Sequence, residues 1–314
     1  MNKTMKITIA VSIAALGLFA FFARNSAAAG EKFVVALPMI EGFEDTKLVE
    51  VFKQINDVVS KKVGVPVLSE NLPFKHNEDL FTIVKDRFKA KKADISYING
   101  RDHGAVLLDK TQGFETLAVL GMNKSTIEKG CFFIRKGSFK SVADLRGKKW
   151  KGSATVTPRY VLYKNGINEP LESFFDVRGF ETDSPVAPLI DDLKSGAIDV
   201  FSTYYHTMWL SGELKKKPQE IEALGCEPME SHWVFVARSD LPKERVDQFR
   251  RIFLSADKDP DFKQFGFAFM MIDGRFMPMD EKTASVNKSF AKLIRDNKWI
   301  DEEKAFMKKY FKQK

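Results

Sequence analysis

The stretch KLVEVFKQINDVVSKKVGVPV, residues 47–67, joins an amphipathic helix to a short apolar strand. Its apolar side chains recur at the three- and four-residue spacing of one helix face, and they are Leu48, Val51, Phe52, Ile55, Val58 and Val59. Gly64 ends this pattern, because glycine is favoured just beyond the C-terminus of a helix. Apolar runs at 65–68 and at 33–37 predict strands on either side. The stretch therefore predicts a strand–helix–strand unit.

The alternation of strands and helices continues along the chain. Further strands are predicted at residues 94–98, 131–135, 198–202 and 231–237, and C-terminal helices at 242–254, 280–296 and 300–311. We therefore expect an α/β fold in which mostly parallel sheets carry helices on both faces. No linker rich in Pro, Gly or Ser divides the chain, which favours two lobes connected by strands that cross between them.

The N-terminus has the features of a secretory signal peptide. Lys3 and Lys6 precede an apolar run at 7–23, and the small residues 27–30 follow it. A basic region, an apolar region and an Ala-x-Ala site predict export to the periplasm, with cleavage after Ala29. An uncleaved membrane anchor is the alternative, because the apolar run approaches the length of a membrane span. Residues 1–29 are left out of the fold prediction.

Charge and cysteine content restrict the function further. The formal charge is +8, of which residues 1–29 contribute +3, so +5 remains for the rest of the chain. This mild and diffuse excess fits a small anionic ligand and does not favour nucleic acid. Cys131 and Cys226 are the two cysteines. An oxidising compartment permits a disulfide between them, two buried free thiols are the alternative, and their spacing does not decide.

The segment KGSATVTPRYVLY, residues 151–163, predicts an anion-binding helix start. Pro158 suits the first helical position, which places Thr157 at the N-cap. Ser153 and Thr155 add two hydroxyl groups just before this helix. Free N–H groups and the positive end of the helix dipole attract anions. An ordinary capped helix is the alternative.

The sequence motifs give little support for an enzymatic function. The histidines show no zinc-ligand pairing, and there is no G-x-S-x-G elbow or G-x-x-x-x-G-K-[ST] loop. We therefore expect no catalytic residue, no metal and no cofactor. A triad of Ser153, His206 and Asp183 would require a spatial arrangement that sequence does not reveal.

The order of several segments resembles a known family. The segments are KLVEVFKQINDVVSKKVGVPV, KADISYING, FKSVADLRGKKW, KSGAIDVFSTYY and WVFVARSDLPKE. Together they resemble the periplasmic solute-binding proteins of ABC importers, of the phosphate, phosphite and phosphonate type. The resemblance spans nearly the whole chain after residue 29.

The resemblance implies a two-lobed fold of the type 2 periplasmic binding proteins. Two hinge strands would cross near residues 129–132 and 237–240. Lobe I would then comprise residues 30–128 and 239–314, and lobe II residues 129–238. The implied protein is a monomer that closes on a phosphonate-, phosphite- or phosphate-like anion. Its implied partner is an inner-membrane ABC permease with its ATPase.

Ligands of open α/β sheets bind outside the carboxyl ends of the strands. This rule and the resemblance select residues near 39–43, 97–101, 153–157 and 202–206. The candidate ligand-binding residues are Phe43, Tyr97, Asn99, Arg101, Ser153, Thr155, Thr157, Thr203, Tyr204, Tyr205 and His206. The Arg101 guanidinium could pair with an oxyanion through two hydrogen bonds, with a solvated arginine as the alternative. The aromatic residues near Trp209 could close over the ligand, with helix packing as the alternative for part of this group. For Asn99 the alternative is a cap on the helix at 103–108.

Two departures from the family pattern bear on the ligand. The turn before Pro158 is shorter than the family's Ser-Thr-Ser turn, and Asp183 lies in the segment where the family often has a histidine. A carboxylate facing the ligand would disfavour a dianion or contact a ligand amine. Two other functions stay open, which are a ligand receptor for a membrane sensor kinase or chemoreceptor, and a periplasmic hydrolase.

Overall fold

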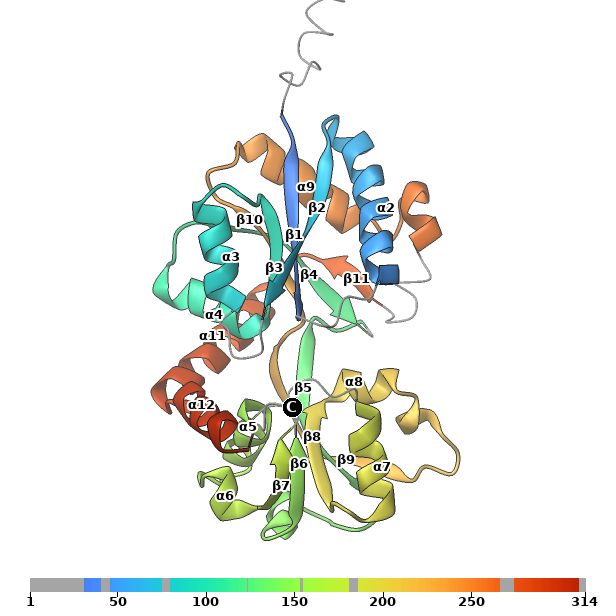
Figure 1. Cartoon of the computed structure of the whole chain (residues 1–314), viewed down its shortest axis with the longest axis vertical. Helices are drawn as coiled ribbons and strands as arrows, with labels where there is room; N and C mark the ends of the chain where they lie inside the picture. Colours follow the sequence, from blue (N-terminus) through green and yellow to red (C-terminus); the bar gives the residue numbers. More distant parts are fainter. Residues whose placement is uncertain are drawn as a thin grey trace, which may run out of the picture.

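The structure is a computed structural model, and it describes residues 31–40, 46–74, 80–122, 124–152, 155–180, 186–265 and 274–310. Two sheets, each with helices against it, lie one above the other in Figure 1. We call each sheet with its helices a lobe. The predicted two-lobed α/β fold is therefore confirmed. Within the described ranges, no helix combines the length and the apolar composition that a membrane span requires.

The first lobe is built on a six-stranded sheet with the order β11-β4-β10-β3-β1-β2. Its strands are β1 (Phe33–Ile40), β2 (Val67–Phe74), β3 (Ile95–Ile98), β4 (Phe114–Met122), β10 (Val234–Arg238) and β11 (Gly274–Met277). Its helices are α2 (Thr46–Val63), α3 (Leu80–Lys89), α4 (Gly100–Asp109) and α9 (Lys243–Ser255), with a 3-10 turn at Pro260–Phe265. The strand–helix–strand unit predicted from residues 33–68 is β1, α2 and β2, and its two strands pair in parallel.

The second lobe is built on a five-stranded sheet with the order β7-β6-β8-β5-β9. Its strands are β5 (Ile127–Arg135), β6 (Lys149–Gly152), β7 (Asp176–Phe180), β8 (Val200–Tyr204) and β9 (Ile221–Ser231). Its helices are α5 (Val156–Lys164), α6 (Leu171–Phe174), α7 (Val186–Ser195) and α8 (Tyr205–Leu210), with 3-10 turns at Val142–Leu145 and Glu213–Lys215. The helices α11 (Glu281–Asp296) and α12 (Trp299–Tyr310) follow near the C-terminus.

Both sheets are mixed rather than mostly parallel. The parallel parts are β2-β1-β3 and β7-β6-β8. The strand β10 enters the first sheet from the second lobe and runs antiparallel to β3 and β4, and β5 enters the second sheet from the first lobe and runs antiparallel to β8. A strand that arrives from the other lobe starts at the edge where the sheet's own strands end, so it must run the opposite way.

The chain crosses between the lobes at positions that differ from those predicted. The first crossing links β4 to β5 across residues 122–127, a few residues before the predicted 129–132. The second links β9 to β10 across residues 231–234, rather than 237–240. Because β10 pairs with β3 and β4, residues 234–238 belong to the first sheet, and the predicted lobe boundary after residue 238 is too late.

The two C-terminal helices divide between the lobes. In Figure 1, α11 lies beside α4 and α12 lies beside α5. The Phe306 side chain of α12 is buried in the core of the second lobe, with its ring centroid 6.0 Å from that of Trp150. The prediction that residues 239–314 all belong to lobe I is therefore wrong for α12. The α11–α12 turn forms a third connection between the lobes.

The helix α11 holds both crossings by buried hydrogen bonds. The Asn287 side chain accepts from the Ser231 backbone N–H at 2.7 Å and donates to the Ser231 hydroxyl at 2.9 Å. The Thr126 and Thr283 hydroxyl oxygens lie 2.6 Å apart. Ser231 ends β9 and Thr126 precedes β5, so each crossing is fixed to the same helix.

Two glycines allow α4 to approach this junction closely. A Cβ atom on Gly104 would lie 2.1 Å from the Asn287 carbonyl oxygen, and one on Gly100 would lie 2.5 Å from the Ser231 nitrogen. Both clashes are with backbone atoms, which cannot rotate away. The spacing between α4, α11 and the second crossing therefore depends on the absence of these two side chains.

We predict that Gly104→Ala destabilises the protein by about 1–3 kcal/mol, the usual cost of overpacking. Helix propensity alone predicts the opposite sign, a gain of about 1 kcal/mol. Denaturant unfolding of the variant and the wild type separates the two effects. A variant as stable as the wild type, or more stable, would show that the α4–α11 contact is not close.

Cys131 on β5 and Cys226 on β9 form a disulfide, which settles the alternatives that the sequence left open. The bond joins neighbouring strands of the second sheet and closes a segment with a sequence separation of 95. This segment includes β6, β7 and β8, so the bond restricts the unfolded chain over most of the second lobe.

We predict that the double variant Cys131→Ala, Cys226→Ala loses about 4–5 kcal/mol of stability, from the loop-closure entropy of a segment this long. Denaturant unfolding of the double variant should show a clearly lower midpoint than that of the oxidised wild type. Equal midpoints would mean that the bond is absent from the folded protein or adds nothing to its stability.

Candidate functional site

Donors from both lobes meet on the carboxylate of Glu230, which lies near the end of β9. The Arg101 backbone N–H, in the first turn of α4, donates to Glu230 Oε2 at 2.6 Å. The Tyr204 hydroxyl, at the end of β8, donates to Glu230 Oε1 at 2.7 Å. Glu230 is buried, and this burial raises the pKa of its carboxyl group. The two hydrogen bonds stabilise its charged form, and one comes from each lobe.

The side chain of Arg101 lies beside the same carboxylate. Its Nε donates to Asp102 Oδ1 at 3.1 Å, and about a third of the side chain is exposed. The negative charges of Asp102, Glu230 and Glu303 raise the pKa of the guanidinium still further above its ordinary value. Glu303 belongs to α12, so Arg101 of the first lobe lies within electrostatic range of a helix packed on the second.

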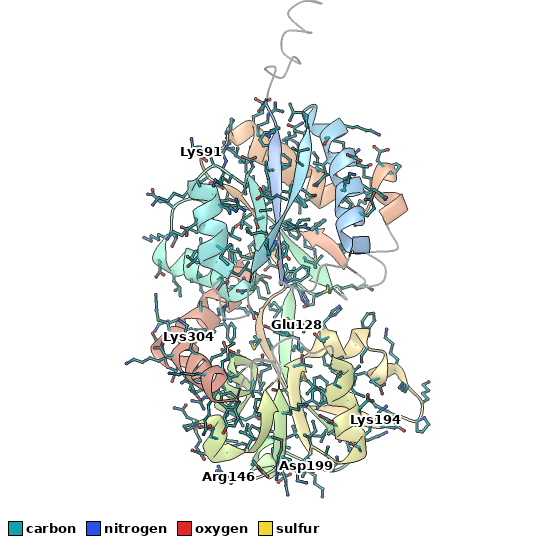
Figure 2. The ribbon with its side chains drawn as sticks, viewed as in Figure 1. Lys91, Glu128, Arg146, Lys194, Asp199 and Lys304 are labelled. Atoms are coloured by element: carbon teal, nitrogen blue, oxygen red, sulfur yellow. A yellow bond between two sulfur atoms is a disulfide. The ribbon has the colours of Figure 1, made fainter. Side chains whose placement is uncertain are left out.

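A second buried carboxyl group, that of Glu128, lies at the start of β5, and Figure 2 shows it at the junction of the lobes. Its Oε1 accepts from the backbone N–H groups of Lys129 at 2.8 Å and His206 at 3.2 Å. Its Oε2 lies 3.3 Å from His232 Nδ1. Glu128 is also directly opposite Glu230 in the β5–β9 pairing, so two carboxyl groups are buried side by side at the crossing.

The environment of Glu128 favours its neutral form. Burial raises the pKa of Glu128 to about 7, and the nearby charge of Glu230 acts in the same direction. Burial also lowers the pKa of His232 to about 3. The proton shared by this pair therefore lies on the carboxyl group, which can donate to the neutral imidazole.

Aromatic side chains from both lobes lie near the junction. Tyr97 and Trp233 stack with their ring centroids 4.9 Å apart, and the Trp233 residue is 49% exposed. His206 stacks on Trp209 at 5.5 Å. An exposed tryptophan within the second crossing is a surface that a ligand could contact.

The first residue of helix α5 differs from the one predicted. The helix begins at Val156 with Thr155 as its N-cap, so Thr157 and Pro158 lie inside the first turn. Pro158 is tolerated there because the first four N–H groups of a helix have no intrahelical partner. The Thr155 backbone N–H donates to Glu303 Oε1 at 3.0 Å, and its buried hydroxyl has no hydrogen-bond partner among the described residues. The Thr157 side chain is buried as well.

The remaining ligand-binding candidates lie in different surroundings. The Asn99 side chain accepts from the Asp102 N–H at 2.7 Å and so caps α4, the alternative role considered for it, although the helix begins at Gly100 rather than at residue 103. Thr203 pairs with Cys131 between β8 and β5, and Tyr205 packs against the core of the second lobe. Phe43, Ser153 and Asp183 lie outside the described residues. Ligand contact by any candidate stays a prediction.

Four residues of the junction were not among the ligand-binding candidates predicted from the sequence: Glu128, Glu230, His232 and Trp233. His232 and Trp233 lie within residues 231–237, which were predicted as one strand, and Glu230 directly precedes them; the chain instead crosses between the lobes before β10 begins at Val234. A run of two polar residues and an exposed aromatic before a buried strand is the signal that marks this crossing. No cluster of three or more His, Cys, Asp or Glu side chains in the described part of the chain is arranged to hold a metal ion.

Glu128 makes stability depend on pH in a definite direction. Because the pKa of Glu128 is raised from 4.5 to about 7, its contribution to stability is complete below pH 4.5 and is lost as the pH rises through 7. The loss between pH 6 and pH 8 should be about 1 kcal/mol.

We predict that Glu128→Gln removes this loss, because glutamine keeps an accepting oxygen for the two backbone N–H groups and a donor for His232. Denaturant unfolding at pH 6 and pH 8 should show the variant gaining about 1 kcal/mol relative to the wild type at the higher pH. The histidine contributions are common to both proteins and cancel in this comparison. The same pH dependence in both proteins would contradict the raised pKa of Glu128.

Comparison with known proteins agrees with the fold. Residues 39–283 match the family described as ABC transporter, phosphonate, periplasmic substrate-binding protein. No curated protein matches the sequence. Among solved structures, XAC2383 from Xanthomonas citri shares 16% identity with a TM-score of 0.60, over 84% of this chain and 99% of that one.

Two further structures carry the word phosphonate in their descriptions. PhnD1 from Prochlorococcus marinus, solved with methylphosphonate, shares 18% identity with a TM-score of 0.59, over 84% of this chain and 98% of that one. PA3383 from Pseudomonas aeruginosa, a binding protein component of an ABC phosphonate transporter, shares 13% identity with a TM-score of 0.52, over 89% of this chain and 99% of that one. These likenesses show the shared fold. Because the family match covers most of the sequence, the chain belongs to the periplasmic substrate-binding proteins of phosphonate ABC transporters.

Proposed function

We propose that this chain captures a small phosphonate-type anion between its two lobes and delivers it to an inner-membrane ABC permease. It acts as an exported monomer without catalytic activity, after removal of residues 1–29. The observation that carries the proposal is the convergence of donors from both lobes on carboxylate oxygens at the junction. The Arg101 N–H and the Tyr204 hydroxyl share one carboxylate, that of Glu230.

The donors at the junction are of the types that recognise oxyanions. The starts of α4 and α5 present backbone N–H groups at the positive ends of two helix dipoles. The partly exposed Arg101 guanidinium can reach an anion through two parallel hydrogen bonds. The Tyr204 hydroxyl of β8 would exchange its bond to Glu230 for one to the ligand, and the stacked Tyr97 and Trp233 add an apolar wall.

Capture would couple to a hinge motion about the two crossings. Donors of the first lobe and donors of the second both reach the ligand only when the lobes are close together. Binding free energy then shifts the equilibrium from an open to a closed form, which the permease recognises. Methylphosphonate, the ligand in the PhnD1 structure, is a suitable first probe for this chain.

We predict that Arg101→Gln and Tyr204→Phe each weaken methylphosphonate binding roughly 10- to 100-fold, because a hydrogen bond to a charged group contributes about 1.5–3 kcal/mol. Calorimetric titration measures this change, with folding of each variant checked by a denaturant melt. Arg146→Gln is the matched control, since Arg146 pairs with Glu169 at the far end of the second lobe.

Two results would count against the proposal. If the wild type binds none of methylphosphonate, phosphite and phosphate, the chain is not a receptor for this class of anion. If it binds one of them and both junction variants bind equally well, the ligand lies away from Arg101 and Tyr204.

A further inference from the structure

The start of α5 is already met by a carboxylate of the protein itself. Glu303 Oε1, from α12, accepts from the Thr155 N–H at 3.0 Å. We infer that Glu303 is an internal competitor for the anion site, which the anionic group of a ligand displaces when it binds at the start of α5. This inference rests on the proposed function and concerns the same site.

The position that Glu303 occupies suits a ligand oxyanion. Thr155 is the N-cap of a nine-residue helix and is 1% exposed. Its buried hydroxyl has no hydrogen-bond partner among the described residues, so Glu303 uses the N–H and leaves the second donor of the same residue unused. An oxyanion with three oxygens could accept from both the Thr155 N–H and the Thr155 hydroxyl. The Glu303 carboxylate oxygen accepts from the N–H alone.

The attachment of α12 to the second lobe does not depend on Glu303. Its neighbour Glu302 pairs with Arg159 Nε at 3.0 Å, and the Arg159 guanidinium lies 5.5 Å from the ring of the buried Trp299. Phe306 packs on Trp150 in the core of the lobe. Because these contacts hold the helix, the bond from Thr155 to Glu303 can open without releasing α12.

The charge of Glu303 also acts on the other lobe. Together with Asp102 and Glu230 it raises the pKa of the Arg101 guanidinium, which places its carboxylate within electrostatic range of that side chain. Glu303 therefore accepts from a donor of the second lobe and lies within electrostatic range of a cation of the first. These are the two partners that the proposed function assigns to a bound anion, so a ligand and Glu303 cannot both have them.

Glu303→Gln tests the competition, because the amide keeps an oxygen that accepts from the Thr155 N–H but carries no charge. A charge-assisted hydrogen bond is roughly twice as strong as a neutral one, so a ligand should displace glutamine more easily. We predict that the variant binds methylphosphonate about fivefold more tightly, or better, in calorimetric titration. Asp301→Asn makes the same charge change at an exposed position of α12 and should alter the affinity by less than about twofold.

The outcomes separate this inference from the proposed function. If the wild type binds methylphosphonate and Glu303→Gln binds it equally or more weakly, the inference is wrong and the function stands. An equal gain in affinity in Glu303→Gln and Asp301→Asn would show that overall charge causes the effect, which would also overturn the inference. If neither the wild type nor Glu303→Gln binds methylphosphonate or inorganic phosphate, the function fails and the inference fails with it. Binding by the variant alone would support the competition by Glu303 but would contradict the proposed function of the wild type.

A measurement on the wild type covers the case in which Glu303→Gln does not fold. Hydrogen exchange at the backbone N–H of Thr155 is slowed by its bond to a carboxylate, and a methylphosphonate oxygen would take over that protection. The Glu303 carboxylate loses its hydrogen bond at the same time, so the ¹³C chemical shift of its side-chain carboxyl group should change on addition of methylphosphonate. An unchanged shift of the Glu303 carboxyl group at saturating methylphosphonate would contradict displacement of Glu303.

Discussion

The structure depends on the hydrogen bonds that fix both inter-lobe crossings to α11. Asn287 bonds to Ser231 at the second crossing, and Thr283 bonds to Thr126 at the first. All four groups are buried, so each would be costly to leave without its partner. This arrangement places the end of β9, and with it Glu230, against the start of α4. It also directs the chain after α11 onto the second lobe, which brings Glu303 to α5.

The two buried carboxyl groups at the junction, Glu128 and Glu230, are stabilised in different ways. Glu230 accepts hydrogen bonds from Arg101 and Tyr204, whereas burial raises the pKa of Glu128 to about 7, so that below this pH it is neutral and can donate to His232. Two adjacent charged carboxylates would repel each other strongly in this environment. The neutral form of Glu128 avoids that cost, and Glu230 accepts from donors of both lobes.

Local patterns in the sequence predicted most of the fold but little of the junction. The helix that ends before Gly64 and its flanking strands were predicted correctly, because periodicity and glycine preference act over short distances. The second crossing was misplaced because residues 231–237 were predicted as a single strand, whereas tertiary pairing separates Ser231, the end of β9, from β10. The pairing of Glu128 with Glu230 depends on the register of strands far apart in the sequence. The contact between Thr155 and Glu303 likewise depends on where α12 docks.

A crystal structure of the protein grown with methylphosphonate tests the central claim most directly, which is that donors of both lobes bind an oxyanion at the junction. The account predicts that the phosphonate oxygens lie within hydrogen-bonding distance of the Arg101 guanidinium and the Thr155 N–H, with the Glu303 carboxylate withdrawn from α5. A phosphonate bound at one lobe alone, or at the junction with Glu303 still bonded to Thr155, would contradict it.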